Sequence, residues 1–364
     1  MLKILWLAPN FNHYKARFLN HLAVENDVIL TILSGSGRIK MGDQELDENW
    51  KFKKIKLNVT KKEFGKSVKV KDAIKPIFND FDWILVPAEK KNLPLLLYTM
   101  KLRKKHKSAR LFSYNHPILK SKNGNVTWLD EMLTKFYYKK LDRVIFYTEQ
   151  SHDWAIKTNL IKSEKAFWAN NTIDNIEVQK YYTYQLPPKD VPSILFIGRL
   201  IASKRIDKLI AFYKRLKEDV PNLRLEIIGD GPESYYVKKA MVIERDIIWH
   251  GILIDEDKIA PIMSRVSIVF VPGHSGLSIN HAFAYGRPYV TLQGLSHAPE
   301  LDYIDVGVNG YILDNDFESN IITIKELLCN RNILEKFCKN AIAKGEDPSY
   351  LSSRKQIKTS LLNE

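Results

Sequence analysis

The stretch Val271-Pro272-Gly273-His274-Ser275-Gly276-Leu277-Ser278-Ile279-Asn280-His281-Ala282 decides the fold class. The apolar run at residues 267–272 predicts a buried strand, and the pattern at residues 277–285 predicts a helix. Gly276 lets the backbone approach a ligand closely, and the N–H groups of Leu277 and Ser278 would lie at the positive end of the helix. A strand, a glycine-containing loop and a helix in this order predict a binding turn at the edge of a parallel sheet.

The same alternation of short apolar runs and helical patterns continues on both sides of this stretch. It is typical of parallel sheets covered by helices, so we predict an α/β fold with two Rossmann-like domains facing each other across a cleft. Strands are predicted in the first half at residues 3–9, 27–35, 82–87, 109–115, 143–148 and 166–171. In the second half they are predicted at residues 193–198, 224–229, 247–251, 267–272, 288–292 and 309–313, with a helix at residues 204–217.

Adjacent prolines at positions 187 and 188 interrupt the pattern near the middle of the chain. Proline pairs are incompatible with a helix interior or a central strand, so this segment is expected to be an extended linker. We therefore predict an N-terminal domain over residues 1–183 and a second domain over residues 184–345. A C-terminal helix within residues 346–364 is expected to pack back on the N-terminal domain.

The composition is that of a folded chain. Of the 364 residues, 45% are hydrophobic and 27% are charged, which excludes a disordered or fibrous protein. Cys329 and Cys338 lie nine positions apart, which fits neither a zinc knuckle nor a disulfide framework and favours a reducing compartment. We expect no membrane span, because every apolar run is shorter than about 20 residues, and no secretory signal at the start. The predicted location is the cytoplasm.

The charge is concentrated in the first half of the chain. Residues 1–175 contain 32 Lys and Arg against 18 Asp and Glu, whereas residues 176–364 contain 24 of each kind, so the net +14 belongs to the first half. An anionic partner is expected there. The candidates are nucleic acid, an anionic membrane surface and a phosphate-bearing substrate.

A candidate phosphate site follows the strand at residues 193–198. Gly198-Arg199-Leu200 ends that strand, and Lys204 and Arg205 stand at the start of the next helix. A guanidinium, an ammonium and free helix-start amides together favour binding of a diphosphate. The alternative is a solvated basic helix start.

Two generic nucleotide-binding motifs are incomplete in this sequence. Gly35-Ser36-Gly37 lacks the third glycine of a dinucleotide fingerprint, and Gly65-Lys66-Ser67 lacks the first glycine of a phosphate loop.

The second half resembles the donor-binding half of family 4 glycosyltransferases of the GT-B fold. The motifs that carry the resemblance are Gly198-Arg199-Leu200 with Lys204, Gly229-Asp230-Gly231-Pro232-Glu233, Gly251, Gly276-Leu277 with Ala282, Ala284-Tyr285-Gly286-Arg287-Pro288, Pro299-Glu300 and Asn309-Gly310. The first half matches more loosely, at Asn115-His116-Pro117, Phe146-Tyr147-Thr148 and Asn171-Thr172-Ile173-Asp174.

The resemblance implies transfer of a sugar, with retention, from a nucleoside diphosphate sugar to a glycan or lipid-linked acceptor, as in bacterial polysaccharide or lipopolysaccharide synthesis. It implies neither a cofactor nor an obligatory metal. Arg199 and Lys204 would hold the diphosphate and stabilise the leaving group. His116 would lie near the transferred sugar, or else be a hydrogen-bonded structural histidine. The further donor-binding residues implied are Gly198, Gly251, Ile252, Gly276, Leu277, Ser278 and Glu300, the last of which could equally cap a helix.

The chain departs from the family pattern at three places. Gly273 and His281 occupy the positions of two family glutamates, so His281 is the expected ribose contact, and His274, Ser275 or Asn280 would have to read the sugar. The glycine pair of the first loop is also absent. Asn10, Asn12 and His13 there would face the acceptor, and His13 could be a general base if the enzyme inverted instead.

The basic first half then has a possible partner, the anionic inner leaflet of the cell membrane. Residues 101–107 follow the apolar helix at 93–100, and residues 51–71 are also rich in lysine. At ~1 kcal/mol per basic residue near an anionic leaflet, such groups would support peripheral binding. The alternative is that the apolar residues are core and the lysines are solvated. Two rival functions remain open: a catalytically inactive sugar-nucleotide binder, and a nonspecific nucleic-acid-binding protein that lacks any recognisable DNA- or RNA-binding motif.

Overall fold

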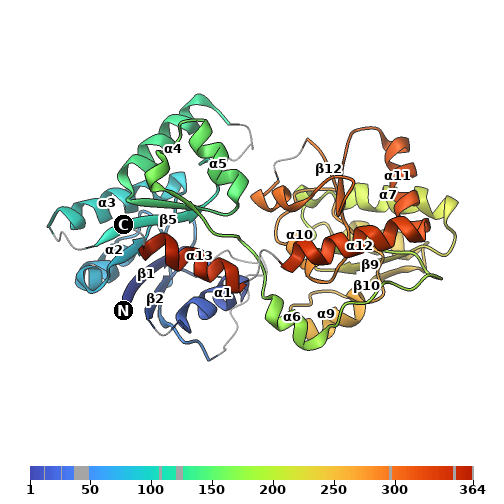
Figure 1. Ribbon diagram of the computed structural model, residues 1–364, viewed down its shortest axis with the longest axis horizontal. Coiled ribbons are helices and arrows are strands. Elements are labelled where there is room, and N and C mark those ends of the chain that lie inside the picture. Colours follow the sequence, from blue (N-terminus) through green and yellow to red (C-terminus); the bar gives the residue numbers. More distant parts are fainter. Residues whose placement is uncertain are drawn as a thin grey trace. The chain divides into compact units, whose positions relative to one another are not determined.

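The structure, a computed structural model, forms two compact units (Figure 1). It describes the chain except residues 12, 26, 37–48, 106–108, 120–125, 295–296, 347–349 and 363–364, and it does not describe the side chains of residues 13, 14, 350 and 351. Unit 1 contains Met1–Asn171 and Tyr350–Glu364, and unit 2 contains Thr172–Ser349.

Unit 1 is built on a parallel sheet with the strand order β3-β2-β1-β4-β5-β6-β7. Its strands are β1 (Leu2–Ala8), β2 (Val28–Ser34), β3 (Lys53–Lys56), β4 (Trp83–Leu85), β5 (Arg110–Asn115), β6 (Arg143–Phe146) and β7 (Ala166–Trp168). Its helices are α1 (His13–Ala23), α2 (Val68–Ile74), α3 (Leu93–Lys105), α4 (Trp128–Lys140), α5 (Glu149–Lys157) and α13 (Tyr350–Leu362).

The core of unit 1 lies on both faces of this sheet. Successive side chains of a strand point to opposite faces, so Leu5 and Leu7 of β1 join one apolar cluster while Ile4 and Trp6 join the other. A strand that is buried on both faces reads as a continuous apolar run, which is why β1 was predictable from the sequence.

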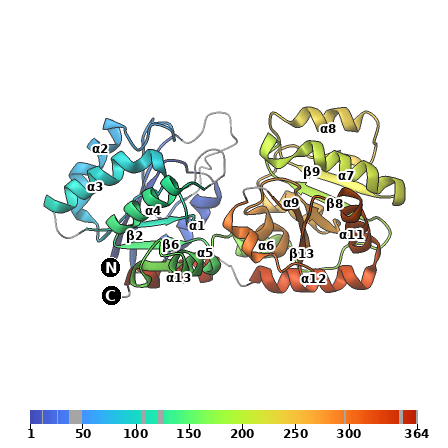
Figure 2. The same ribbon diagram turned by 90° about the horizontal axis from the view of Figure 1, so that it is seen from above.

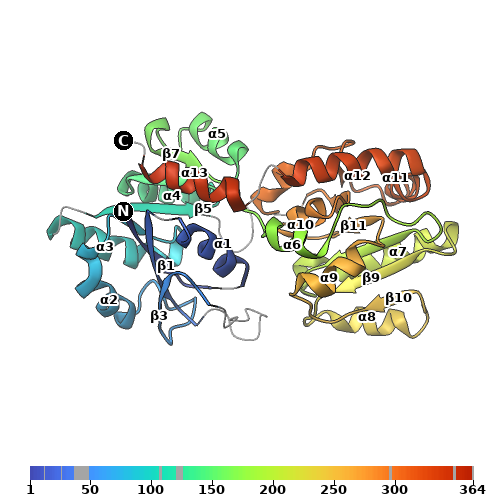
Figure 3. The same cartoon turned by 60° about the horizontal axis from the view of Figure 1, so that its bottom comes forward.

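Helix α13 completes the second of these clusters. It lies beside α1 (Figures 1 and 3), and its Ile357 and Leu361 are fully buried. The indole Nε1 of Trp83 donates to the carbonyl of Leu361 at 3.0 Å, and the guanidinium of Arg143 donates to the carbonyl of Ser360. The helix expected within residues 346–364 is therefore found at 350–362, packed on unit 1.

Unit 2 has a second parallel sheet with the strand order β10-β9-β8-β11-β12-β13. Its strands are β8 (Ser193–Ile197), β9 (Arg224–Ile228), β10 (Ile247–Trp249), β11 (Ile268–Phe270), β12 (Tyr289–Leu292) and β13 (Gly310–Leu313). Its helices are α6 (Asn175–Tyr181), α7 (Ile206–Asp219), α8 (Ser234–Met241), α9 (Glu256–Met263), α10 (Ser278–Ala284), α11 (Phe317–Cys329) and α12 (Arg331–Glu346). Helices α7 and α8 cover one side of the sheet and α12 the other (Figure 2).

The division between the units falls twelve residues before the predicted boundary, between Asn171 and Thr172. Side-chain contacts place residues 172–183 in unit 2: the amide of Asn175 donates to the backbone carbonyl of Gly345 at 2.7 Å, and the hydroxyl of Tyr182 donates to the backbone carbonyl of Tyr285 at 3.1 Å. The proline segment is extended but does not mark the boundary. It is held within unit 2, where the buried guanidinium of Arg287 donates to the carbonyl of Gln185 at 3.0 Å.

Candidate functional site

The candidate site of unit 2 lies where the strand order of its sheet reverses. From β8 the chain moves outward to β9 and β10, and from β11 it moves in the opposite direction to β12 and β13. The loops that follow β8 and β11 therefore leave the carboxyl edge of the sheet on either side of a crevice, which is where open α/β sheets bind ligands. These two loops contain residues 198–205 and 271–277, the two stretches that the sequence singled out.

The two loops touch backbone to backbone. The N–H group of His274 donates to the carbonyl of Ser203 at 2.7 Å. A Cβ atom at position 273 would lie 2.3 Å from that same carbonyl oxygen and 2.4 Å from the Cα of Lys204. Position 273 therefore has room for glycine alone, which explains structurally why no glutamate stands there.

Charged groups gather around these loops. Desolvation, followed by the positive charge of Arg199, lowers the pKa of Lys204 to about 8, while the carboxylate of Glu300 acts in the opposite direction. Glu300 is only 2% exposed, and a Cβ atom at Gly276 would lie 3.7 Å from its Oε2. The predicted residues Arg199, Lys204, Gly276 and Glu300 are thus brought together at one place, with Gly198 beside them, since a Cβ there would lie 3.7 Å from the Lys204 Nζ.

A buried hydroxyl network supports the glycine loop from below. Tyr289 of β12 donates to Ser275 Oγ at 3.0 Å and lies 2.7 Å from Ser278 Oγ, and Ser275 Oγ lies 3.0 Å from Thr291 Oγ1. Burial raises the pKa of Tyr289, so its hydroxyl stays protonated and can donate. Ser275 is fully buried in this network, so it supports the loop.

His297 fixes the loop from the other side, and sequence reasoning missed it. Its Nδ1 accepts from the N–H of Ser275 at 3.1 Å, and its Nε2 bonds the carbonyl of Leu292 at 2.9 Å, which assigns the proton to Nε2. A lone histidine three positions before Glu300 carries no signal in a single sequence, because its partners are backbone groups that only the fold brings near.

His281 has a partner that the sequence did not indicate. It is 2% exposed, its Nε2 lies 3.1 Å from Glu256 Oε2, and the hydroxyl of Tyr285 donates to the same oxygen at 2.7 Å. Glu256 begins α9, so this triad ties α9 to α10. In the structure the imidazole contacts the carboxylate of Glu256 and so helps to hold α10 against α9. The contact of His281 with a ribose stays a prediction.

Gly251 and Ile252 follow β10 at the same edge of the sheet. Gly251 has a φ of +69°, in the left-handed region that favours glycine, and its carbonyl accepts from the N–H of Gly229 at 2.6 Å. The side chain of Ile252 is 54% exposed. Ile252 thus presents an apolar side chain to solvent at this edge, and its part in donor binding stays a prediction.

The predicted residues of unit 1 belong to a separate body. His116 follows β5, is exposed, and its ring meets that of Tyr147 edge to face at 5.0 Å. Asn10 is half-buried after β1. Asn12 and the side chain of His13 lie outside the described residues.

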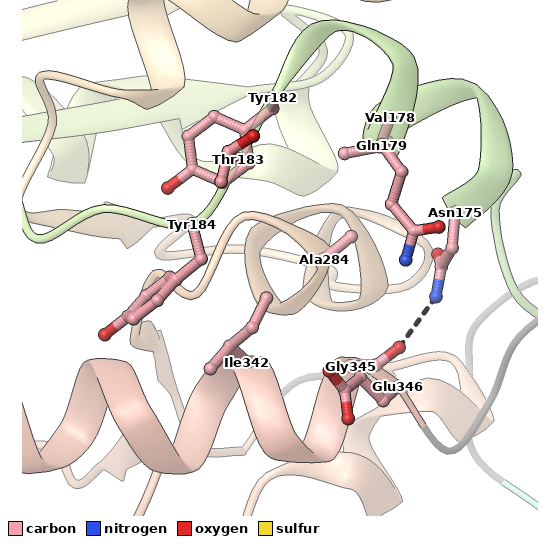
Figure 4. Close-up of a pocket in the computed structure, with 10 residues that line it drawn as sticks. All are labelled: Asn175, Val178, Gln179, Tyr182, Thr183, Tyr184, Ala284, Ile342, Gly345 and Glu346. Atoms are coloured by element: carbon pink, nitrogen blue, oxygen red, sulfur yellow. Dashed lines mark hydrogen bonds between the residues drawn. The ribbon is translucent and has the colours of Figure 1, made fainter.

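A cavity of about 300 Å³ lies elsewhere in unit 2, at the carboxyl-terminal end of α10 (Figure 4). Helices α6, α10 and α12 and the segment after α6 line it, and the bond from Asn175 to Gly345 crosses its wall. None of the predicted catalytic or binding residues lines it. It is therefore distinct from the charged loops, which precede the opposite end of α10.

Two other kinds of feature are absent from the part of the chain that the structure describes. They contain no group of three or more His, Cys, Asp or Glu side chains arranged to hold a metal ion. Among the helices of the same residues, none combines the length and the apolar character that crossing a membrane requires.

Comparison with known proteins identifies the region that contains these loops. Residues 191–330 match the family described as "Glycosyl transferases group 1". The GDP-mannose-dependent alpha-mannosyltransferase of Corynebacterium glutamicum is 29% identical over 147 residues, which cover 39% of this chain and 33% of that protein. The match thus spans about a third of the curated relative. The resemblance to glycosyltransferases is confirmed for this region.

Solved structures extend the likeness of fold to the whole chain. Sucrose-phosphate synthase from Thermosynechococcus elongatus has a TM-score of 0.73 at 14% identity and covers 99% of this chain and 98% of its own. Anabaena HepE in complex with UDP and glucose has a TM-score of 0.69 at 16% identity, with both chains fully covered. The lipopolysaccharide outer core galactosyltransferase WaaB has a TM-score of 0.65 at 14% identity, with 99% of both chains covered. The predicted fold class, two Rossmann-like domains of the GT-B type, is confirmed.

Proposed function

We propose that this protein is a glycosyltransferase that takes its sugar from a nucleoside diphosphate sugar bound by unit 2. The observation that carries the proposal is the cluster of Arg199, Lys204 and Glu300 around a glycine loop at the strand reversal of the unit 2 sheet. Two cations beside one buried carboxylate leave an excess of positive charge, and a diphosphate is the anion that such a cluster binds at this kind of edge.

The cluster also suits the chemistry of the transfer. When the bond between the sugar and the diphosphate breaks, negative charge grows on the departing oxygen. Donors that are fixed in place before the reaction stabilise this charge without further reorganisation. Arg199 would bind two phosphoryl oxygens side by side, and Lys204 would supply a point charge. The amides of Leu277 and Ser278, at the start of α10, would add two neutral donors.

The remaining features of the proposal rest on the family resemblance. Transfer with retention needs no metal or cofactor here, and His116 would contact the transferred sugar. The acceptor would be a glycan or a lipid-linked glycan of a bacterial surface polysaccharide or lipopolysaccharide. The named mannosyltransferase and the galactosyltransferase WaaB support sugar transfer in general.

Nucleotide binding and donor hydrolysis test the proposal. Isothermal titration with a panel of nucleoside diphosphates should identify one that binds, and the matching sugar nucleotide should release that diphosphate slowly in the absence of an acceptor. Arg199→Ala and Lys204→Ala should each weaken binding by tenfold or more, whereas the exposed Lys239→Ala on α8 should leave it unchanged. If both site variants turned over the donor like the wild type, the diphosphate assignment would be wrong.

An inactive sugar-nucleotide binder is the second candidate, and position 273 favours it. The glycine there cannot replace the family glutamate, and the imidazole of His281 is engaged by Glu256. Such a protein would bind the nucleotide with the same dependence on Arg199 and Lys204 but would release no diphosphate from any sugar nucleotide. The hydrolysis measurement therefore separates the two candidates.

We further propose that unit 1 binds peripherally to the anionic inner face of the cell membrane. The segment at 93–107 contributes less than the sequence indicated, because Leu95 and Leu96 are fully buried. Among the large apolar side chains that the structure describes in this segment, Leu97 is the one that is exposed, at 48%. Helix α4 offers the better surface. Its exposed apolar residues are Trp128, Leu129, Met132 and Phe136, and the exposed Lys135 and Lys139 lie on the same helix.

Vesicle flotation tests the membrane proposal. The wild type should float with anionic vesicles at low salt and remain behind with zwitterionic ones, because the lysines supply the attraction and the apolar side chains insert at the interface. The double variant Trp128→Ser with Met132→Ser should lose most of this binding. Ile322→Ser, which removes an equally exposed apolar side chain from unit 2, serves as the control.

A further inference from the structure

The cavity at the carboxyl-terminal end of α10 has no part in the proposed transfer of sugar. Its volume of about 300 Å³ is at the lower end of the range of pockets that bind small organic ligands, roughly 300–1,000 Å³. Its lining residues come from α6 and the segment that follows it, the end of α10, and α12, and all of them belong to unit 2. The cavity can therefore hold one ring-sized molecule within a single unit.

Asn175 places an unpaired hydrogen-bond acceptor at this cavity. Its side chain is 9% exposed, and its Nδ2 donates to the backbone carbonyl of Gly345 (Figure 4). This bond fixes the orientation of the amide, because only the nitrogen can donate to a carbonyl. Oδ1 is buried and receives no hydrogen bond from any residue that the structure describes. A buried amide oxygen without a donor costs free energy, so the cavity favours a ligand that donates a hydrogen bond.

Tyr184 lines the same cavity and has a second unpaired group. Figure 4 shows its ring on the other side of Ile342 from Asn175. The hydroxyl is buried and has no hydrogen-bond partner within the described part of the chain. The ring packs against Gly286, where a Cβ atom would lie 2.5 Å from Cε2, so it cannot move in that direction. Burial raises the pKa of the hydroxyl to about 12, so this group stays protonated and can both donate and accept.

The charges at the cavity favour a neutral ligand. Among the lining residues that the structure describes, Glu346 is the only acidic or basic one, and its side chain is exposed. An anionic ligand would therefore find no cation in the wall. The ring of Tyr182 already has the buried guanidinium of Arg287 at 6.0 Å from its centroid, so a cationic ligand on this wall would be repelled.

We propose that this cavity binds a neutral, hydroxyl-rich ligand, namely one sugar ring, either free or at the end of a glycan. Its hydroxyl groups would donate to Asn175 Oδ1 and to the carboxylate of Glu346. Its C–H groups would pack against the apolar side chains of Ala284 and Ile342 and the ring of Tyr182. The site is separate from the charged loops of unit 2, so the inference goes beyond the proposed function and does not depend on it.

Methyl resonances of the full chain test this inference. The isoleucine methyl groups are labelled with carbon-13, and the signal of Ile342 is assigned through Ile342→Val. Methyl glycosides of glucose, galactose, mannose and N-acetylglucosamine are the single-ring probes. At least one of them should shift the Ile342 signal saturably. A trisaccharide that ends in the best of these rings is the glycan probe, and butylammonium is the cationic probe.

Variants connect the shift to the cavity. Ala284→Leu should raise the dissociation constant about tenfold or more, because the larger side chain takes up space in the cavity. Ala343→Leu adds the same side chain at an exposed position of α12 and should leave binding unchanged. Glu346→Ala removes an exposed acceptor and should weaken binding severalfold. This variant also covers the case in which Ala284→Leu fails to fold, as judged by circular dichroism.

The outcomes decide both the site and the source of the ligand. The inference is overturned if no glycoside shifts the Ile342 signal, if both site variants bind like the wild type, or if butylammonium binds more tightly than every glycoside. Tighter binding of the trisaccharide assigns the end of a glycan, whereas equal or weaker binding assigns a free sugar. Donor hydrolysis is measured separately, so either result can fail while the other stands.

Discussion

Lys204 has its positive charge only below about pH 8, because its ammonium group is partly removed from water and lies near Arg199. Affinity for a diphosphate should therefore fall as the pH rises through that value. We expect the dissociation constant of the preferred nucleoside diphosphate to increase about tenfold between pH 7 and pH 9, since above the pKa each pH unit removes tenfold of the charged form. Isothermal titration across this range measures the effect.

Lys204→Arg is the matched variant for this pH dependence. A guanidinium stays protonated throughout the range, so the pH dependence should disappear even if its different shape weakens binding overall. An equal dissociation constant for the wild type at pH 7 and pH 9 would exclude Lys204 from the diphosphate contact. The free energy of unfolding depends on pH in the opposite direction. Because the pKa of Lys204 is lower in the folded state than in the unfolded state, this group makes folding less favourable below pH 8. This cost disappears as the pH rises toward 10.5.

Gly273 and Gly276 should respond differently to the same substitution. A Cβ atom at 273 would meet backbone at 2.3 Å, whereas one at 276 would meet the Ala298 Cβ at 3.3 Å. Gly273→Ala should cost about 1–3 kcal/mol in the free energy of unfolding by urea, and Gly276→Ala should cost less. Equal effects of the two changes would contradict the backbone contact between the loops.

At the residue level, the charged residues of the candidate site were easier to predict from the sequence than the residues that hold its loops in place. Arg199 and Lys204 were identifiable because they follow a predicted strand, and Glu300 was implied by the family resemblance; the structure places the three close together. His297 and the pairing of His281 with Glu256 were not identifiable, because their partners come from distant segments or from the backbone. Residue type and spacing indicate which charged residues follow a strand, but they do not indicate contacts with distant segments or with the backbone.

At the element level, helix α13 is the part of unit 1 whose loss is easiest to measure. Leu361→Ala should lower the free energy of unfolding by about 2–5 kcal/mol, because it leaves a cavity beside the unit 1 sheet. Leu362→Ala is the control, since that neighbouring side chain is 51% exposed and should change stability by less than about 0.5 kcal/mol. Urea unfolding followed by tryptophan fluorescence reports mainly on this unit, because six of the seven tryptophans belong to it. Equal effects of the two changes would contradict the packing of α13.

The central strands were predictable because strands that are buried on both faces of a sheet have apolar sequences. Strand β3 was not predictable in this way. Its sequence, Lys53-Lys54-Ile55-Lys56, contains three lysines and was not predicted as a strand. It lies at the edge of the sheet beside β2, where exposed lysines are tolerated and prevent pairing with another chain. Apolar periodicity detects a central strand and misses a solvated edge strand of this kind.

For the whole molecule, two separate cores predict two unfolding events. We expect calorimetry to resolve two transitions, and the bound nucleoside diphosphate to raise only the one that belongs to unit 2. At a ligand concentration of about 100 times the dissociation constant, the added stability should be about 2.7 kcal/mol. At the same ligand concentration, the tenfold or greater weakening expected for Arg199→Ala should reduce this added stability to about 1.4 kcal/mol or less. A single transition, or an equal shift of both, would contradict this assignment of the ligand to unit 2.

The presence of two α/β units was predictable from the alternation of strand and helix patterns, whereas the exact boundary between the units was not. The two parallel sheets follow from the repeated strand and helix patterns. The boundary at Asn171 depends on contacts of residues 172–183 with α10 and α12, which no local signal announces.

Because α13 belongs to unit 1 but follows unit 2 in the chain, the order of synthesis has a consequence for folding in the cell. When Asn171 leaves the ribosome, the sheet of unit 1 is complete but the apolar groove that receives Ile357 and Leu361 is still open. It stays open until residues 350–362 have been translated, which makes the nascent chain a natural client for a chaperone during that interval.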